Sequence, residues 1–214
     1  ANDTLGEPSI ADMTSKAIDI LDNNDKGYFL MVESGRIDHG HHAGSAYNAL
    51  TDTIAFSDAV KAAVEKVDLS ETLIIVTADH SHVFTIAGYP KRGNPILGKV
   101  IPIGSVEPSV ADDGLPYTTV GYMNGRGFRD YSDTVTDADV TYNDDPITGR
   151  VDLTGVDTTS SGFHQEALVP LSSETHAGED ISVHAIGPSA HLFQGVIEQN
   201  VIFHVINNAM NAGK

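Results

Sequence analysis

The stretch TLIIVTADHSH, residues 72–82, decides the fold class. Residues 72–77 form a short, continuous apolar run, which is typical of a β-strand that is buried on both faces. Asp79, His80 and His82 follow this run at once, so polar chemistry begins where the strand ends. In open α/β sheets, ligands gather beyond the carboxyl ends of the strands. The stretch therefore predicts an α/β domain with a ligand site at this strand end.

The same arrangement occurs upstream. Residues 28–32 form another apolar run, and VESGRIDHGHH follows it as residues 32–42. Three histidines and two carboxylates crowd this segment: Glu33, Asp38, His39, His41 and His42. Two strand ends with similar side chains favour one shared site.

The apolar spacing around these strands is helical. It predicts helices over residues 10–21, with Ser9 as N-cap, and over about 43–67. Beyond them, residues 181–186 predict a third strand, preceded by His176, and residues 194–210 predict a final helix. The alternation of helix and strand predicts a three-layer α/β sandwich with a mainly parallel central sheet.

The amino-acid composition of the chain changes after about residue 87. Residues 88–170 are rich in Gly, Pro, Asp, Thr and Ser, which predicts an irregular insertion with short strands such as 117–122. We therefore divide the chain into an α/β core with ligand loops (1–87), an insertion (88–170), and a return to the core (171–214). Within the insertion, TDADVTYNDDPITGRVD (136–152) favours a plain loop over a calcium loop, because it lacks the EF-hand pattern.

Composition limits the possible partners. The sequence has no cysteine, so any metal must be held by His, Asp and Glu. A net charge of −18 opposes nucleic-acid binding and predicts an acidic, solubilising surface suited to a salty habitat. No apolar stretch approaches the roughly 20 residues of a membrane span. The first residues lack a signal-peptide pattern, so we expect a mature or trimmed chain.

Four segments resemble the second half of bacterial- or animal-type alkaline phosphatases. They are VESGRIDHGHHAG (32–44), LIIVTADHSH (73–82), PYTTVGYMNGRGF (116–128) and VPLSSETHAGEDISVHAIGPSAHLFQGVIEQN (169–200). The spacing Glu-x4-Asp-x3-His, followed by T-A-D-H-x-H and T-H-x-G-E-D, is highly specific. The resemblance implies an alkaline phosphatase-like fold in which the insertion is crown-like. It also implies hydrolysis of small phosphate monoesters through a phosphoserine, with two zinc ions and one magnesium ion.

The resemblance also implies a role for each metal-site residue. The three protein ligands of one zinc match Asp38, His42 and His176. Two ligands of the second zinc match Asp79 and His80, and a magnesium ligand matches Glu33. A residue that orients an aspartate ligand by hydrogen bonding matches His82. Two zinc ions about 3.5–4 Å apart would clamp the attacking and leaving oxygens of a phosphate ester. We expect His39 and His41 to shape the loop or meet substrate. We expect His164, His184, His191 and His204 to pack or lie at the surface, with an approach of His164 to the pocket as the alternative.

The family's nucleophilic serine has no match here, since no Asp-Ser-Ala or Asp-Ser-Thr occurs. The chain therefore resembles a carboxy-terminal half, either one fragment of a nicked enzyme docked on an amino-terminal half or a truncated product. We prefer the docked fragment, because uncovered apolar sheet edges promote aggregation, and we expect the isolated chain to be inactive. The resemblance further implies a homodimer in the periplasm or outside the cell.

Two other functions remain open from the sequence. One is a metal-dependent phosphodiesterase or sulfatase, because that superfamily shares the metal frame; Glu33 and the THAGED context favour the monoesterase. The other is a non-catalytic metal-binding module, in which acidic residues and histidines only store or sense cations.

Overall fold

The computed structural model describes residues 6–131 and 145–211, which fall into two compact units. Unit 1 contains residues 1–33, 55–81 and 179–214, and unit 2 contains residues 34–54 and 82–178. Most of the segment predicted to be a loop or calcium loop, residues 136–144, lies outside the described residues.

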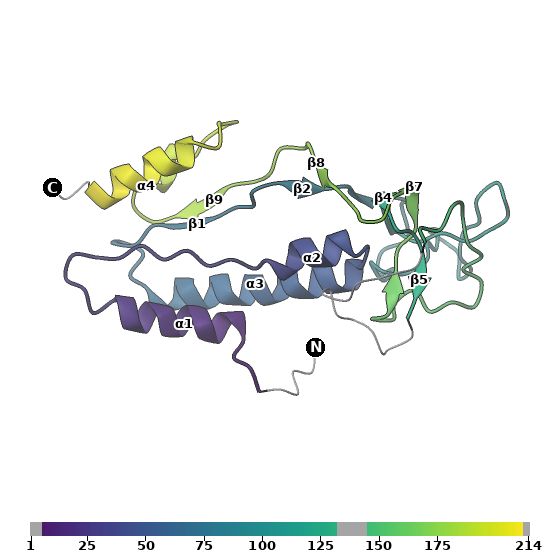
Figure 1. Ribbon diagram of the computed structural model, residues 1–214, viewed down its shortest axis with the longest axis horizontal. Helices are drawn as coiled ribbons and strands as arrows, with labels where there is room; N and C mark the ends of the chain where they lie inside the picture. The colour runs from purple at the N-terminus through teal and green to yellow at the C-terminus, as the bar shows by residue number, and fades with distance from the viewer. Residues whose placement is uncertain (1–5, 132–144, 212–214) are drawn as a thin grey trace. The chain divides into compact units, whose positions relative to one another are not determined.

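Unit 1 combines helices with one small sheet (Figure 1). Its strands β1 (Ile74–Val76) and β9 (His184–Ile186) pair antiparallel. Its helices are α1 (Ile10–Leu21), the later part of α3 (Ala46–Lys66), the short 3-10 helix η1 (Ala190–Leu192) and α4 (Val201–Asn211).

Helix α1 begins at a capping box. The Ser9 hydroxyl accepts the Asp12 backbone N–H at 3.1 Å, and the Asp12 carboxylate accepts the Ser9 N–H at 3.2 Å. These bonds satisfy amide donors that the first turn of a helix leaves open. An ion pair of 2.7 Å between Lys66 Nζ and Asp19 Oδ1 then joins the end of α3 to α1.

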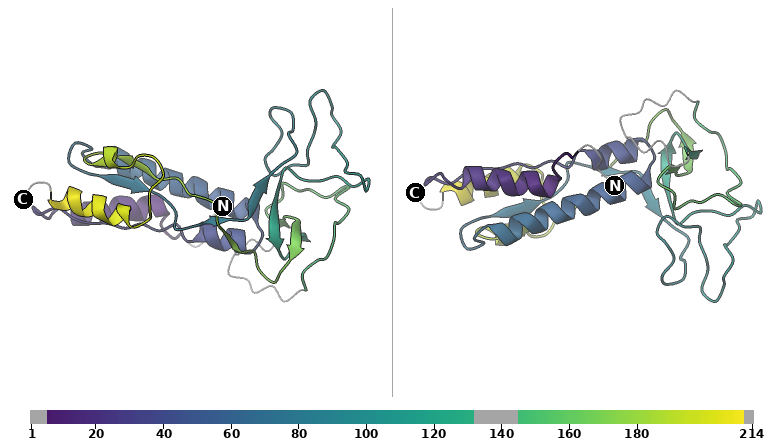
Figure 2. Two further views of the ribbon diagram at one scale, coloured as in Figure 1. Left: turned by 90° about the horizontal axis from the view of Figure 1, so that it is seen from above. Right: turned by 90° about the horizontal axis from the view of Figure 1, so that it is seen from below.

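Unit 2 holds α2 (Arg36–His42), the first turns of α3 and the short strands of the insertion. Strand β4 (Val120–Gly125) pairs antiparallel with β3 (Phe84–Ile86) and parallel with β7 (Ala167–Pro170). Strands β5 (Arg129–Asp130) and β6 (Phe163–His164) form an antiparallel pair. The remaining strands are β2 (Ser81–His82), which starts at the boundary between the units, and β8 (His176–Ala177). Figure 2 shows the long irregular loops that separate β3 from β4.

The insertion is fastened to the junction between α2 and α3. His164 is 1% exposed, and its Nδ1 donates to the Ala43 carbonyl at 2.7 Å. The Ala46 N–H donates to the Gln165 side-chain oxygen at 2.7 Å, at the first residue of α3. Leu153 and Phe163 are fully buried in the same unit. The two hydrogen bonds hold the insertion to the segment that follows α2.

Unit 1 leaves large apolar side chains exposed, both in α4 and in the segment 28–32. Ile18 and Val205 are buried, whereas Phe29, Met31 and Phe203 are 60%, 73% and 65% exposed. Exposed apolar side chains mark a surface that another piece of protein covers where they form one contiguous patch. No helix within residues 6–131 and 145–211 is long and apolar enough to cross a membrane.

Several elements differ from the sequence prediction. Helix α1 has the predicted bounds and α3 falls inside the predicted 43–67. Residues 28–32, predicted as a strand, form no strand, and α2 was not predicted at all. The strand pairs described above include three antiparallel pairs and one parallel pair. A mainly parallel sheet is therefore not seen among the described strands, and it stays a prediction for a chain with further strands.

Candidate metal centre

Helix α2 brings two of the predicted ligands together. Asp38 and His42 are four residues apart, so they lie on one face of the helix. The His42 Nε2 atom is 3.3 Å from Asp38 Oδ1. Gly40, between them, is buried against α3: a Cβ atom at this position would lie 2.7 Å from the Ala49 backbone nitrogen. The glycine thus allows α2 to approach α3 closely and holds the ligand face in place.

Two more histidines of unit 2 face the same carboxylate. Asp38 Oδ1 lies 3.0 Å from His82 Nε2 and 3.4 Å from His176 Nε2. The Nε2 atoms of His42 and His176 are 3.1 Å apart. Unit 2 therefore gathers side chains from three distant stretches of the sequence: Asp38 and His42, His82, and His176.

The spacing of these atoms fits a zinc ion. Tetrahedral zinc with bonds of about 2.0–2.1 Å places its ligand atoms about 3.3 Å from one another. The three distances among Asp38, His42 and His176 are 3.3, 3.4 and 3.1 Å. One carboxylate and two imidazoles are also a donor set that zinc accepts. The three predicted ligands of the first zinc thus form one face of a suitable coordination shell.

Hydrogen bonds set the orientation of His42. Its Nδ1 donates to the Glu174 carbonyl at 2.7 Å, which leaves Nε2, the atom facing Asp38, available to a metal. Glu174 returns the contact, since its N–H donates to the His42 carbonyl at 3.2 Å. Such a partner on the outer ring nitrogen is typical of metal-binding histidines.

His82 lies between two carboxylates, those of Glu174 and Asp38. Its Nδ1 is 2.8 Å from Glu174 Oε2, and its Nε2 is 3.0 Å from Asp38 Oδ1. Burial alone would lower the pKa of His82, but the Glu174 hydrogen bond and the charges of Glu174 and Asp38 raise it above the usual value. The ring is therefore held from both sides.

His41 contacts the site from behind rather than as a ligand. Its ring stacks on His82 with centroids 4.6 Å apart, and a hydrogen bond of 2.9 Å joins its Nδ1 to the Tyr122 hydroxyl. Burial, followed by the nearby His82 charge, lowers the pKa of His41 to about 4, so it stays a neutral imidazole. Burial likewise raises the pKa of Tyr122.

The other predicted site residues lie in unit 1. Glu33 is exposed. His80 Nε2 is 3.4 Å from Asp79 Oδ2, and the Asp79 side chain is 82% exposed. Within unit 1, Asp79 and His80 thus form a neighbouring pair.

The remaining histidines have contacts of their own. His39 Nδ1 is 3.3 Å from an Arg36 nitrogen on the exposed side of α2. His164 donates a hydrogen bond to the Ala43 carbonyl between α2 and α3. His184 Nε2 is 3.1 Å from the Ser182 hydroxyl. These contacts agree with loop-shaping and packing roles.

Sequence reasoning missed Glu174. Its side chain is fully buried, although its neighbours Ser173 and Thr175 are exposed. The available signal was its place two residues before His176 in SSETH. A single glutamate in a polar segment did not indicate burial, which depends on the partners that the fold brings to it.

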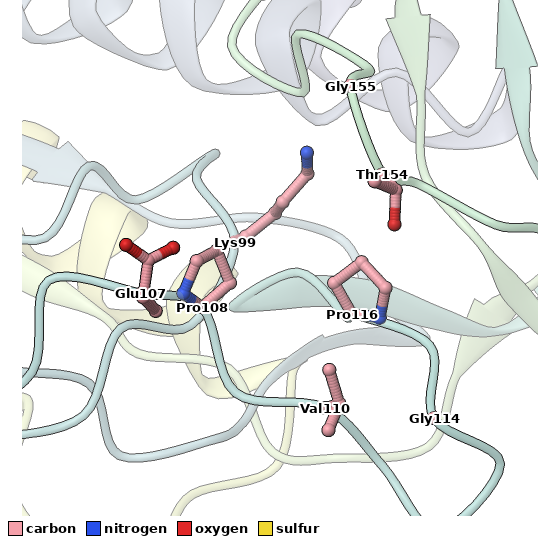
Figure 3. Close-up of a pocket in the computed structure, with 8 residues that line it drawn as sticks. All are labelled: Lys99, Glu107, Pro108, Val110, Gly114, Pro116, Thr154 and Gly155. Carbon is pink, nitrogen blue, oxygen red and sulfur yellow. The ribbon is translucent and has the colours of Figure 1, made fainter.

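Unit 2 also contains a separate pocket of about 220 Å³ in the insertion (Figure 3). It is lined by Lys99, Glu107, Pro108, Val110, Gly114, Pro116, Thr154 and Gly155. Because none of these lining residues is a metal-centre residue, the pocket is not part of that site.

Comparison with known proteins points to one family. A family model described as alkaline phosphatase matches residues 1–212. The tissue-nonspecific alkaline phosphatases of Rattus norvegicus and Homo sapiens are 42% and 40% identical to this chain over 210 residues. These alignments cover 98% and 97% of this chain but 36% of each relative, so the chain spans only about that share of their length.

Solved structures agree on the fold. A point mutant of TAB5 alkaline phosphatase, described with Mg bound in its M3 site, aligns with a TM-score of 0.55 and 24% identity. The alignment covers 94% of this chain and 41% of that one. This likeness supports the α/β fold class.

Proposed function

Because this chain belongs to the alkaline phosphatase family, we propose that it forms part of a metal-dependent phosphomonoesterase acting on small phosphate esters. The observation that carries the proposal is the meeting of Asp38, His42 and His176 at zinc-like spacing within unit 2. The roles follow the resemblance: Asp38, His42 and His176 for one zinc, Asp79 and His80 for a second, Glu33 for magnesium, and His82 to orient Asp38.

The chain's own residues would prepare the site for ester hydrolysis. Zinc bound there would act as a Lewis acid that stabilises charge on the oxygens of the ester during displacement. Asp38 supplies negative charge, while the hydrogen bond from His42 Nδ1 to Glu174 keeps His42 Nε2 directed inward. His82 restrains the Asp38 carboxylate, so the ligands need little rearrangement when metal arrives.

We further propose that the serine nucleophile lies in an amino-terminal half outside these 214 residues. The exposed Phe29, Met31 and Phe203 support a protein partner at unit 1. In the complete enzyme we expect a three-layer sandwich with a mainly parallel sheet, a crown-like insertion over 88–170, a homodimer, and a periplasmic or extracellular location. The isolated chain should not turn over substrate.

The first experiment compares two histidines of α2 in the complete protein. His42→Ala should weaken zinc binding, measured by chelator competition, by more than the roughly 10–100-fold that loss of an outer partner costs. His39→Ala, on the exposed side of the same helix, is the matched control and should bind zinc as wild type does. Equal losses in both variants would favour a loose cation store over an enzyme site.

Turnover rates of the complete protein on different esters test the reaction class. Turnover of an aryl phosphate monoester should exceed that of the corresponding diester and sulfate ester, and His42→Ala should abolish it. A preference for the diester or sulfate would replace the monoesterase with the related hydrolase. Serine-dependent turnover by the isolated 214 residues would refute the placement of the nucleophile.

A further inference from the structure

Glu174 is a carboxylate with no exposed surface beside the metal centre. Burying a charged carboxylate is costly unless hydrogen bonds compensate it. Both oxygens have donors: Oε2 accepts from His82 Nδ1 at 2.8 Å, and Oε1 accepts from the Val83 N–H at 2.9 Å. The carboxylate therefore bonds to the segment that presents His82.

The backbone of Glu174 makes two hydrogen bonds to His42. Its carbonyl accepts from His42 Nδ1, and its N–H donates to the His42 carbonyl. One residue thus touches the outer nitrogen of two histidines whose inner nitrogens, at 3.0 and 3.3 Å, face the same Asp38 oxygen. The side chain bonds to His82 and the backbone bonds to His42, whose Nδ1 also lies 3.4 Å from Glu174 Oε2.

Glu174 is itself fixed against β4. A Cβ atom on Gly125 would lie 3.4 Å from the Glu174 Cβ, which is van der Waals contact, so the segment packs directly against the strand. The next residue is tied to Asn124 twice: the Thr175 N–H donates to Asn124 Oδ1 at 3.0 Å, and Asn124 Nδ2 donates to the Thr175 hydroxyl at 2.8 Å. A support for two histidines needs this rigidity.

We propose that Glu174 is a positioning residue of the metal centre: through His82 it sets the direction of the Asp38 carboxylate without itself binding the ion. The proposal rests on the function proposed above. Glu174, His42 and His82 together offer atoms within 4.8 Å, which by itself would suit a metal. The oxygens of Glu174 are already taken by two donors, so it serves as an acceptor instead.

The test replaces Glu174 by Gln in the complete protein. Glu174→Gln leaves the backbone bonds to His42 in place and removes only the charge of the carboxylate, which bonds to His82 and Val83 and lies 3.4 Å from His42 Nδ1. We expect zinc affinity, measured by chelator competition, to fall by roughly 10–100-fold, the usual cost of losing an outer partner. The visible absorption of bound Co²⁺ should also change, since it reports ligand geometry, while the zinc-free protein should keep its cooperative unfolding.

Glu179→Gln is the matched control. Glu179 also accepts a hydrogen bond, from the Ser81 hydroxyl at 2.9 Å, but it is exposed, and the variant should keep wild-type zinc affinity and Co²⁺ absorption. If Glu174→Gln does not fold, Glu174→Asp retains the charge with a side chain shorter by about 1.5 Å. It should still lose several-fold in affinity.

Two failures are distinguishable. Tight zinc binding by wild type with unchanged affinity and Co²⁺ absorption in the Glu174 variants would overturn the positioning role and leave the proposed function standing. Weak, multiple zinc sites in wild type would overturn the proposed function itself.

Discussion

At the scale of single residues, Asp38 and His41 have contrasting tasks although they share one short helix. Asp38 points one oxygen at three imidazole nitrogens, and these contacts suit a ligand. His41 is packed beside His82 and Tyr122, and these contacts suit a neutral support. His42, of the same type as His41 and next to it, faces Asp38 instead, so position on the helix separates these contacts.

The low pKa of His41 predicts acid sensitivity. In unfolded chains a histidine titrates near pH 6.5, whereas folded His41 takes its proton only at about pH 4. The folded state therefore binds fewer protons between these values, and its stability falls as the pH is lowered through this window. The loss from this residue should reach about 3 kcal/mol.

His41→Gln removes the titrating ring. In zinc-free protein, urea unfolding should show a smaller loss of stability from pH 6.5 to 4 in this variant than in wild type. The same loss in both proteins would mean that His41 titrates normally in the fold.

At the scale of elements, the contact between α2 and α3 decides where the ligands lie. Alanine favours helices over glycine by about 1 kcal/mol, yet Gly40→Ala would force a Cβ atom to 2.7 Å from the Ala49 nitrogen. Overpacking of this kind costs about 1–3 kcal/mol. We expect a net loss of stability of up to about 2 kcal/mol together with weaker zinc binding.

Urea unfolding and chelator competition measure both effects. Gly178→Ala is the control, because nothing lies within 4 Å of a Cβ atom there and its backbone is not left-handed. A Gly40→Ala protein as stable as the control variant would contradict the close approach of the two helices.

Sequence predicts elements well where local signals suffice. The capping box at Ser9 and the apolar spacing after it give the bounds of α1 correctly. Local signals do not predict α2, whose seven residues include an internal glycine and show no apolar stripe. Packing on α3 stabilises this helix instead. Residues 28–32 have a strand's composition but pair with no strand among the described residues. A strand needs a partner, and sequence composition cannot supply one.

The candidate site divides in the same way. The resemblance to alkaline phosphatases implied site roles for Asp38, His42, His82 and His176, and unit 2 brings their side chains together. The sequence did not predict Glu174, because its position in the site depends on long-range contacts with His82 and Val83. The predicted metals, and the ligand roles of Glu33, Asp79 and His80, stay predictions.

At the scale of the whole molecule, the net charge of −18 predicts salt-dependent stability. Like charges repel in the folded state, and raising salt from 0.1 to 1 M shortens the screening length from about 10 to 3 Å. NaCl should therefore raise the thermal midpoint at pH 7 by a few degrees.

Repeating the series near the sequence pI of about 4.6 provides the control, since repulsion vanishes when the net charge is near zero. An equal gain at both pH values would point to a general salt effect instead of screening.

The pairing of His42 with Glu174 has a consequence for synthesis and folding. These partners are 132 residues apart in the chain, and the whole insertion lies between them. Contacts between such distant residues form late, because a long loop must close before they gain anything. As the ribosome makes this protein, α2 emerges before the distant segment and must wait for it. The whole insertion is therefore made before Asp38, His42 and His176 can meet.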